Sequence, residues 1–216
     1  LATELGKKLG VEAQLVNGRR VTDAQSLEII TMVYGGLANK NIVAQLQAQH
    51  CNAIGLSGAD ANTIKAHKRP VGEIDFGFVG DVDSVNAKNI ESLLQGGFTP
   101  VFCAITHDGK GQLFNTNADT IASEIAIGMS ELYTTTLFYC FEKKGVLLDI
   151  SDEDSVIKNI DSNSYQDLLQ KKIIADGMLP KLENCFHALQ KNVNKVCIGD
   201  ISMLRPTSTL FTTITL

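Results

Sequence analysis

Apolar residues along the chain alternate between short continuous runs and longer runs with helical spacing. The runs "FTPVFCAI", "TLFYCFE" and "KVCIGD" are short and rich in β-branched or aromatic residues, which is typical of buried strands. The segments "AKNIESLLQGG", "SYQDLLQKK" and "MLPKLENCFHALQ" repeat apolar residues as on one face of a helix. Further strands are expected at "AQLVNG" and "NAIGLS", a hairpin at "EIDFGFVGDV", and a β-branched terminal strand at "TLFTTITL".

Small polar residues and glycines indicate where the first long helix begins and ends. Thr22, followed three residues later by Gln25, predicts a capping box for an apolar helix through Tyr34. The glycine pair at residues 35–36 is expected to break or kink that helix. A second helix is then expected over residues 39–49.

Three more helices complete the pattern. The opening segment is expected to be a helix that ends at Gly10. Another helix is expected over residues 119–129, and Ser151 with acidic residues after it predicts a further start. Because apolar strands alternate with helices, the sequence predicts an α/β fold with a mostly parallel sheet and helices on both faces. The absence of repeats and long linkers in the sequence predicts one compact domain.

Composition describes an ordinary soluble globular protein. The chain has 216 residues, of which 44% are hydrophobic and 20% charged, enough for one sizeable core or two small lobes. A net charge of −5 offers no general attraction for nucleic acid. No apolar stretch approaches the roughly 20 residues of a membrane span, so neither nucleic acid nor a membrane is expected as a partner.

The five cysteines are scattered and form neither a C-x-x-C pair nor a cluster with the four histidines. Such a set suggests reduced thiols and a cytoplasmic location. Neither a tightly held metal nor a catalytic thiol is expected. The sequence also lacks G-x-G-x-x-G and G-x-x-x-x-G-K-[ST], which removes the usual support for dinucleotide and Walker-type phosphate sites.

Three polar stretches at strand ends are candidates for chemistry. "VNGRRVTD" places two arginines in a turn, and the guanidinium fork suits a carboxylate or a phosphate. "FNTNAD" places two asparagines and an aspartate before a helix, where plain capping is the simpler explanation. "CFEKKGVLLD" ends a strand, where open α/β sheets bind ligands, although alone it is better explained as a charged surface turn.

A fourth stretch, "IIADGMLPKLENC", is the most unusual. Pro180 is tolerated in the first turn of a helix, and Lys181 follows it, where a cation opposes the helix dipole. Such a lysine lowers stability a little unless an anion binds beside it. Backbone amides and a lysine at one helix start therefore predict a phosphate site.

Taken in order, these stretches resemble the amino-acid kinase family, and within it the branch that phosphorylates N-acetylglutamate. The segments "VNGRRVTD", "NKNIVAQL", "FNTNADTIA" and "ADGMLPKLENCFHAL" match that pattern over essentially the whole chain. The resemblance implies a single domain built as a three-layer αβα sandwich around an open, mostly parallel sheet. It also implies an acylglutamate lobe over about residues 1–133 and a nucleotide-binding lobe over about residues 134–216.

The implied reaction is ATP-dependent transfer of a phosphoryl group to the side-chain carboxylate of an N-acyl-L-glutamate in arginine synthesis, with Mg²⁺ accompanying ATP. By resemblance, Arg20 would clamp the α-carboxylate of the substrate and Asn115 would help to hold it. Asp119 would organise the catalytic lysines, and Lys181 would neutralise charge on the transferring group. The nucleotide would be bordered by Glu142, Lys143, Lys144, Gly145, Val146, Leu147, Ile173, Ile174 and Ala175.

This interpretation requires Arg20 and Lys181 to approach opposite ends of one bound dianion, with Asp119 tethering the arrangement. The resemblance also implies a homodimer through the long apolar helix over residues 22–34, although that helix is equally well explained as core.

The sequence departs from the family pattern in two places. The family begins with a strand carrying a lysine and paired glycines, followed by a triple-glycine turn, whereas this sequence starts in the helix that follows them. We therefore expect a longer polypeptide, with an intact mass well above that of the 216 residues, and no activity from these residues alone. Relatives commonly carry an aspartate where this chain has Glu142, which leaves the individual contacts to ATP open.

Several alternatives stay open. Aspartokinases, glutamate 5-kinases, carbamate kinases and uridylate kinases share the expected fold, but the "NGRRVTD" turn favours an N-acylglutamate over free amino acids. The acyl group is not determined, so N-succinylglutamate is an alternative substrate. A non-catalytic amino-acid sensor is an alternative from another class, and a nicotinamide oxidoreductase is poorly supported because no glycine fingerprint is present.

Overall fold

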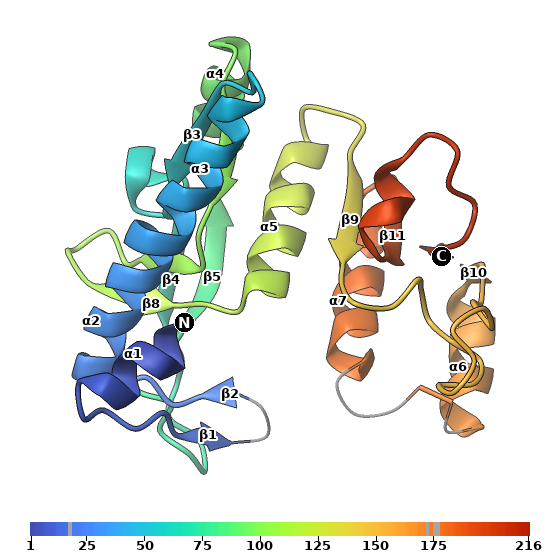
Figure 1. Ribbon diagram of the computed structural model, residues 1–216, viewed down its shortest axis with the longest axis horizontal. Coiled ribbons are helices and arrows are strands. Elements are labelled where there is room, and N and C mark those ends of the chain that lie inside the picture. The colour runs from blue at the N-terminus through green and yellow to red at the C-terminus, as the bar shows by residue number, and fades with distance from the viewer. Residues whose placement is uncertain (17–18, 172, 175–177) are drawn as a thin grey trace. The chain divides into compact units, whose positions relative to one another are not determined.

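The computed structural model describes residues 1–216 with the exception of 17–18, 172 and 175–177 (Figure 1). The chain forms two compact units, Leu1–Ile121 and Ala122–Leu216. Their boundary lies inside helix α5 (Ala118–Ser130), earlier in the chain than the lobe boundary expected near residue 133. The assignment of one substrate to each lobe stays a prediction.

The first unit contains short strands in three groups. The strands are β1 (Leu15–Val16), β2 (Arg19–Arg20), β3 (Ala53–Leu56), β4 (Ile64–Lys68), β5 (Gly80–Val85), β6 (Thr99–Phe102), β7 (Ile105–His107) and β8 (Leu113–Asn115). A four-stranded sheet has the order β5-β4-β7-β8, in which only the β4–β7 pair is parallel. β3 and β6 pair in parallel and β1 and β2 antiparallel, so the unit mixes both kinds of pairing.

One long helical column dominates the first unit. The helices are α1 (Ala2–Lys8), α2 (Ala24–Ile30), the π-helix η1 (Thr31–Ala38), α3 (Asn39–Ala48), the short 3₁₀ turn η2 (Asp60–Asn62) and α4 (Ala87–Gln95). Backbone angles stay helical at both ends of η1, so α2, η1 and α3 run on without a break (Figure 1).

The glycine pair therefore does not break the helix, so of the two expected outcomes, a break or a kink, the break is wrong. Both glycines lie inside η1, and the chain passes through them in the wider turns of a π-helix. A Cβ at Gly35 would lie 3.7 Å from Cδ1 of Ile105 in β7, so Gly35 lies beside the sheet. The helix continues there although glycine by itself disfavours it.

The expected capping box at Thr22 is also wrong, because the next residue caps the helix. Oδ1 of Asp23 accepts a hydrogen bond from the amide of Ser26 at 2.7 Å. Thr22 is fully buried and uses its backbone elsewhere. Its amide donates to the carbonyl of Phe76 at 2.9 Å, and its carbonyl accepts from the amide of Phe78 at 2.6 Å.

Three further expectations differ from the structure. No helix starts at Ser151, because its amide and hydroxyl both bond Oδ1 of Asp149 and close a tight turn instead. The hairpin expected within "EIDFGFVGDV" is formed by β5 with β4, a strand that was missed because exposed Lys65, His67 and Lys68 obscure its apolar positions. The run "FTPVFCAI" is divided between β6 and β7.

The second unit has one four-stranded sheet with the order β10-β12-β11-β9. Its strands are β9 (Thr136–Cys140), β10 (Asn159–Ile160), β11 (Lys195–Gly199) and β12 (Thr212–Ile214). β11 is parallel to β9 and antiparallel to β12, and β12 is parallel to β10. The helices are α6 (Ser162–Gln170), α7 (Met178–Gln190) and the 3₁₀ turn η3 (Ile201–Leu204), and Asp161 caps α6 in a capping box.

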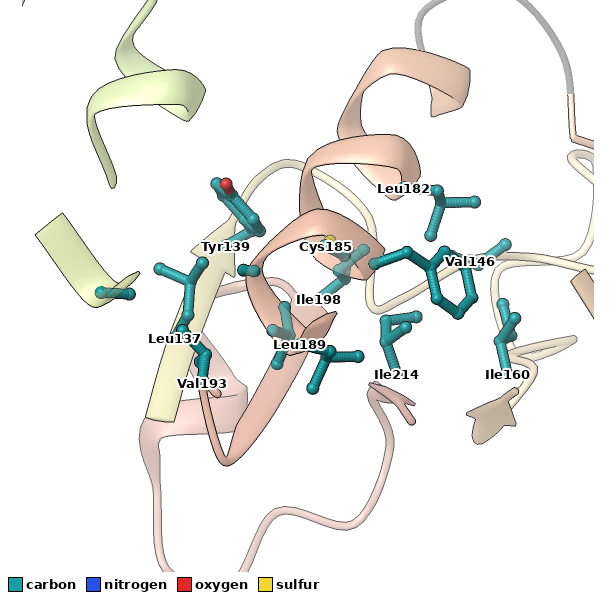
Figure 2. Packing of buried hydrophobic residues seen from close by; sticks show 14 of the residues in the cluster. Leu137, Tyr139, Val146, Ile160, Leu182, Cys185, Leu189, Val193, Ile198 and Ile214 are labelled. Atoms are coloured by element: carbon teal, nitrogen blue, oxygen red, sulfur yellow. The ribbon is translucent and has the colours of Figure 1, made fainter. Parts of the chain in front are cut away.

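The core of the second unit lies between the sheet and α7. Figure 2 shows its buried side chains converging from the sheet strands and from α7. Leu182, Ile198 and Ile214 are completely buried there. None of the helices in the described ranges combines the length and apolar composition that a membrane span requires.

We expect the Asp23→Ala variant to lower the free energy of unfolding by about 1 kcal/mol at pH 7, because the amide of Ser26 loses its acceptor. The hydrogen bonds from Ser26 hold the pKa of Asp23 below its ordinary value. The stability that Asp23 adds is therefore complete above that ordinary value and is lost as the pH falls through the lowered pKa. Urea denaturation at pH 7 and at strongly acidic pH measures both effects.

The control is Asp23→Asn, which keeps an acceptor but does not titrate. Its stability should match the wild type at pH 7 within a few tenths of a kcal/mol. A loss in the Asn variant equal to that in the Ala variant would contradict the capping role.

Candidate active site

Arg20 lies at the edge of a small pocket in the first unit. It ends strand β2 and is half-buried, and its Nη2 atom donates a hydrogen bond to Oγ1 of Thr3 in α1 at 2.7 Å. The pocket wall also includes Ser26 and the apolar side chains of Ile29 and Ile30. A guanidinium beside an apolar wall can bind a carboxylate whose carbon chain lies along that wall.

The first asparagine of the "FNTNAD" turn is tied to the segment that carries Arg20. Nδ2 of Asn115 donates to the buried Oγ1 of Thr22 at 3.0 Å, across 93 residues of sequence. The amide of Asn115 donates to the carbonyl of Phe78 at 2.9 Å. Because Thr22 follows Arg20 by two residues, these bonds bring the Asn115 and Arg20 segments to one side of the unit.

The second asparagine caps a helix, as the simpler explanation of this turn required. Oδ1 of Asn117 accepts from the amide of Thr120 at 3.0 Å, at the start of α5. Between the asparagines, the buried hydroxyl of Thr116 lies 2.8 Å from that of Thr106 and donates to the carbonyl of Gly80 at 3.2 Å. Asp119 lies in the first turn of α5, where a carboxylate suits the helix dipole.

Lys181 lies in the first turns of α7, in the second unit. Its Nζ atom is 4.8 Å from the centroid of the Tyr139 ring in β9. The hydroxyl of Tyr139 is in turn 2.6 Å from Oγ of Ser123 in α5. Arg20 and Asp119 belong to the first unit and Lys181 to the second, so their approach to one substrate stays a prediction.

The turn after β9 carries two lysines that are paired with acids. Nζ of Lys143 lies 3.2 Å from Oε1 of Glu153, and Nζ of Lys144 lies 2.5 Å from Oδ1 of Asp154. The hydrogen bond to Asp154 raises the pKa of Lys144 above its ordinary value. Both lysines lie half-buried on the same turn, and Glu142 before them is exposed.

The next residues of this turn are anchored in the interior. A Cβ at Gly145 would lie 2.7 Å from Oγ1 of Thr212, a distance that leaves room only for glycine. The amide of Val146 donates to the same Oγ1 at 2.8 Å, and the Val146 side chain is buried. Leu147 pairs with Val156 in an isolated bridge.

The second segment expected at the nucleotide follows α6. The Ile174 side chain is buried in the core of the second unit. The amide of Ile173 donates to the carbonyl of Leu168 at 3.0 Å, and Ile173 packs against the same core. Ala175 lies outside the described residues. In this structure Val146 and Ile174 thus support the turns from inside, and their role at the nucleotide stays a prediction.

Three residues that shape these turns were missed in the sequence analysis. The sequence predicts Thr22 to cap a helix, and it predicts only that Thr212 and Tyr139 lie in strands. Only Tyr139 could have been singled out from the sequence. Exposed and buried residues alternate along β9, which places the Tyr139 ring inside, and a buried tyrosine hydroxyl needs a hydrogen-bond partner. The hydrogen bonds of Thr22 and Thr212 join segments far apart in sequence, so no local pattern indicates them.

Comparison with known proteins shows the family of the chain. The sequence pattern of the Amino acid kinase family matches residues 1–200. The chain belongs to the amino acid kinase family. A protein of Phocaeicola vulgatus named acetylglutamate kinase is 55% identical over 197 residues, which cover 91% of this chain and 77% of the relative. An acetylglutamate kinase of Bacteroides thetaiotaomicron is 53% identical over 204 residues, which cover 94% and 79%.

A solved structure agrees with membership of the amino acid kinase family. The structure of smu.665 from Streptococcus mutans UA159 matches with a TM-score of 0.81 at 25% identity, over 99% of this chain and 81% of that one. The α/β fold of the amino acid kinase family is therefore confirmed, with parallel and antiparallel strand pairs mixed in the sheets.

We expect the Thr22→Val variant to lower the free energy of unfolding by about 1–3 kcal/mol, because Nδ2 of Asn115 loses its acceptor in a partly buried place. Urea denaturation of Thr22→Val, Asn115→Ala and the double variant measures the coupling between the two side chains. The double variant should be more stable than the sum of the single losses predicts. Strictly additive losses would show that the hydrogen bond contributes nothing.

Proposed function

We propose that this protein transfers the terminal phosphoryl group of ATP to the side-chain carboxylate of N-acetyl-L-glutamate. The product is N-acetyl-L-glutamyl 5-phosphate, an intermediate of arginine biosynthesis. The observation that carries the proposal is the 55% identity, over 91% of the chain, to a protein named acetylglutamate kinase. Further relatives with that name are 52–54% identical over most of the chain.

The first unit offers suitable groups for the acylglutamate. Arg20 can bind the α-carboxylate through two parallel N–H bonds while the pocket wall receives apolar atoms. Asn115 has an amide that can donate to a substrate oxygen, and Thr22 holds that side chain in one orientation. These groups recognise the end of the substrate that does not react.

The second unit offers suitable groups for ATP. Lys143 and Lys144 stand on the turn over residues 142–147 with half-buried side chains, and residues 173–175 complete the proposed nucleotide border. Within the described ranges, no group of three or more His, Cys, Asp or Glu side chains is placed to hold a metal ion. We infer that Mg²⁺ is brought by ATP, because this ion usually binds through substrate phosphates in phosphoryl transfer.

The chemistry requires alignment and cancellation of charge. The attacking carboxylate and the γ-phosphate are both anions, so positive groups must lower their repulsion as they approach. The substrate carboxylate is itself the nucleophile, and no side chain of the protein has to attack. Lys181 supplies positive charge to the transferring phosphoryl group, and Asp119 organises the catalytic lysines by accepting their hydrogen bonds.

The homodimer and the cytoplasmic location stay predictions. N-succinyl-L-glutamate stays an alternative substrate, because a change of one or two side chains in the acyl pocket would admit the longer acyl group. If the protein is instead a sensor, it binds an amino acid without transferring a phosphoryl group.

An ATP-dependent hydroxamate assay tests the function on protein expressed from the complete gene. We expect acyl phosphate to form with N-acetyl-L-glutamate, and kcat/KM to be higher than with N-succinyl-L-glutamate. A large advantage for the succinyl substrate would replace the acetyl assignment while keeping the reaction class. Amino-acid binding by calorimetry with no ADP formed would favour the sensor and overturn the kinase.

We expect Lys181→Ala to lower kcat by about 100- to 1,000-fold, because one positive group facing the transition-state charge is lost. KM for the acylglutamate should change only slightly, since the lysine acts at the phosphoryl end. The matched control is Lys191→Ala, which removes an exposed lysine just after the other end of α7. Unchanged turnover in Lys181→Ala, with the control also unchanged, would remove Lys181 from the mechanism.

A further inference from the structure

Tyr139 is a buried tyrosine in a core made mostly of aliphatic side chains. Its side chain points inward from β9 beside Leu137, and it is only 4% exposed. In Figure 2 its hydroxyl points away from the rest of the labelled cluster. That hydroxyl lies 2.6 Å from Oγ of Ser123 in α5, both buried, so the ring is held at both ends.

The face of this ring receives the ammonium group of Lys181. Nζ lies 4.8 Å from the ring centroid, inside the range of a cation–π interaction. Leu182, the next residue of α7, is completely buried in the core. Because α7 is fixed by that core, the Lys181 side chain leaves the helix beside β9 and meets the ring there.

We propose that Tyr139 is a positioning residue that aims Lys181 for phosphoryl transfer, an inference that rests on the proposed function. A lysine side chain has many rotamers, and catalysis requires one of them. The fixed ring selects the rotamers that lay the ammonium on its face. Ser123 keeps the ring from turning, and it lies one helical turn after Asp119 in α5.

The ring suits this task because it holds a cation without adding a negative charge beside it. The ring carries no net charge, so it holds the cation by its quadrupole and leaves the positive charge of the lysine intact. An aliphatic residue would fill the same core space without holding the cation.

Two variants separate the ring from the hydroxyl. Tyr139→Leu removes the aromatic face, and Tyr139→Phe keeps it while removing the hydrogen bond to Ser123. We expect kcat to fall roughly three- to thirty-fold in the Leu variant, the factor that corresponds to a cation–π interaction. KM for the acylglutamate should stay within about two-fold, and the Phe variant should retain most of the activity.

A double-variant test shows whether Tyr139 acts through Lys181. In a Lys181→Ala background, Tyr139→Leu should lower kcat no further, because the group it positions is gone. The same fold-loss in both backgrounds would mean that the ring serves the core alone and would overturn the proposal. Unchanged kcat in Tyr139→Leu would overturn it as well.

An NMR measurement is independent of turnover. The ε-methylene protons of Lys181 should be shifted upfield by the ring in the wild type and in Tyr139→Phe, and should move toward random-coil values in Tyr139→Leu. Unshifted protons in the wild type would overturn the proposal even if the Leu variant fails to fold. Shifted protons in a wild type that forms no acyl phosphate would instead locate the failure in the proposed function, and the positioning role would fall with it.

Discussion

The arrangement of the first unit depends on one buried threonine. The backbone of Thr22 bonds the loop at Phe76 and Phe78, and its hydroxyl accepts from Asn115. These bonds join the strand that carries Arg20, the loop before β5 and the end of β8. Gly77 makes the contact possible, because its φ is +70° and a Cβ there would lie 2.2 Å from the Thr22 carbonyl oxygen. Each polar group of Thr22 is buried and paired, so losing a partner is costly.

The second unit repeats this construction with another threonine. Oγ1 of Thr212 accepts from the amide of Val146 at 2.8 Å and donates to the carbonyl of Ile157 at 2.7 Å. Gly145 again provides the space for close approach. In both units a buried hydroxyl holds a polar turn against a sheet, and the turn presents its charged residues to the outside.

The lysines of the second unit are held in two different ways. Lys143 and Lys144 pair with acids whose side chains are mostly exposed, and such pairs contribute little stability and exchange readily for phosphate oxygens. Nζ of Lys181 lies over the face of the Tyr139 ring. The roles proposed for Lys143 and Lys144 in binding ATP and for Lys181 in phosphoryl transfer stay predictions.

The sequence alone determined the α/β class, most of the element order and the family. Apolar periodicity and helix-end residues act within a few positions of each other, so α3, α4, α5 and β11 lie close to where the pattern predicts them. Interactions between distant segments were decided by the tertiary structure. The helix continues through the glycine pair, of which Gly35 lies beside β7. The hydroxyl of Thr22, which was expected to cap a helix, instead accepts a hydrogen bond from Asn115. The contact of Tyr139 with Lys181 also depends on how β9 packs against α7. The two residues are far apart in the sequence, so no local pattern indicates that they meet.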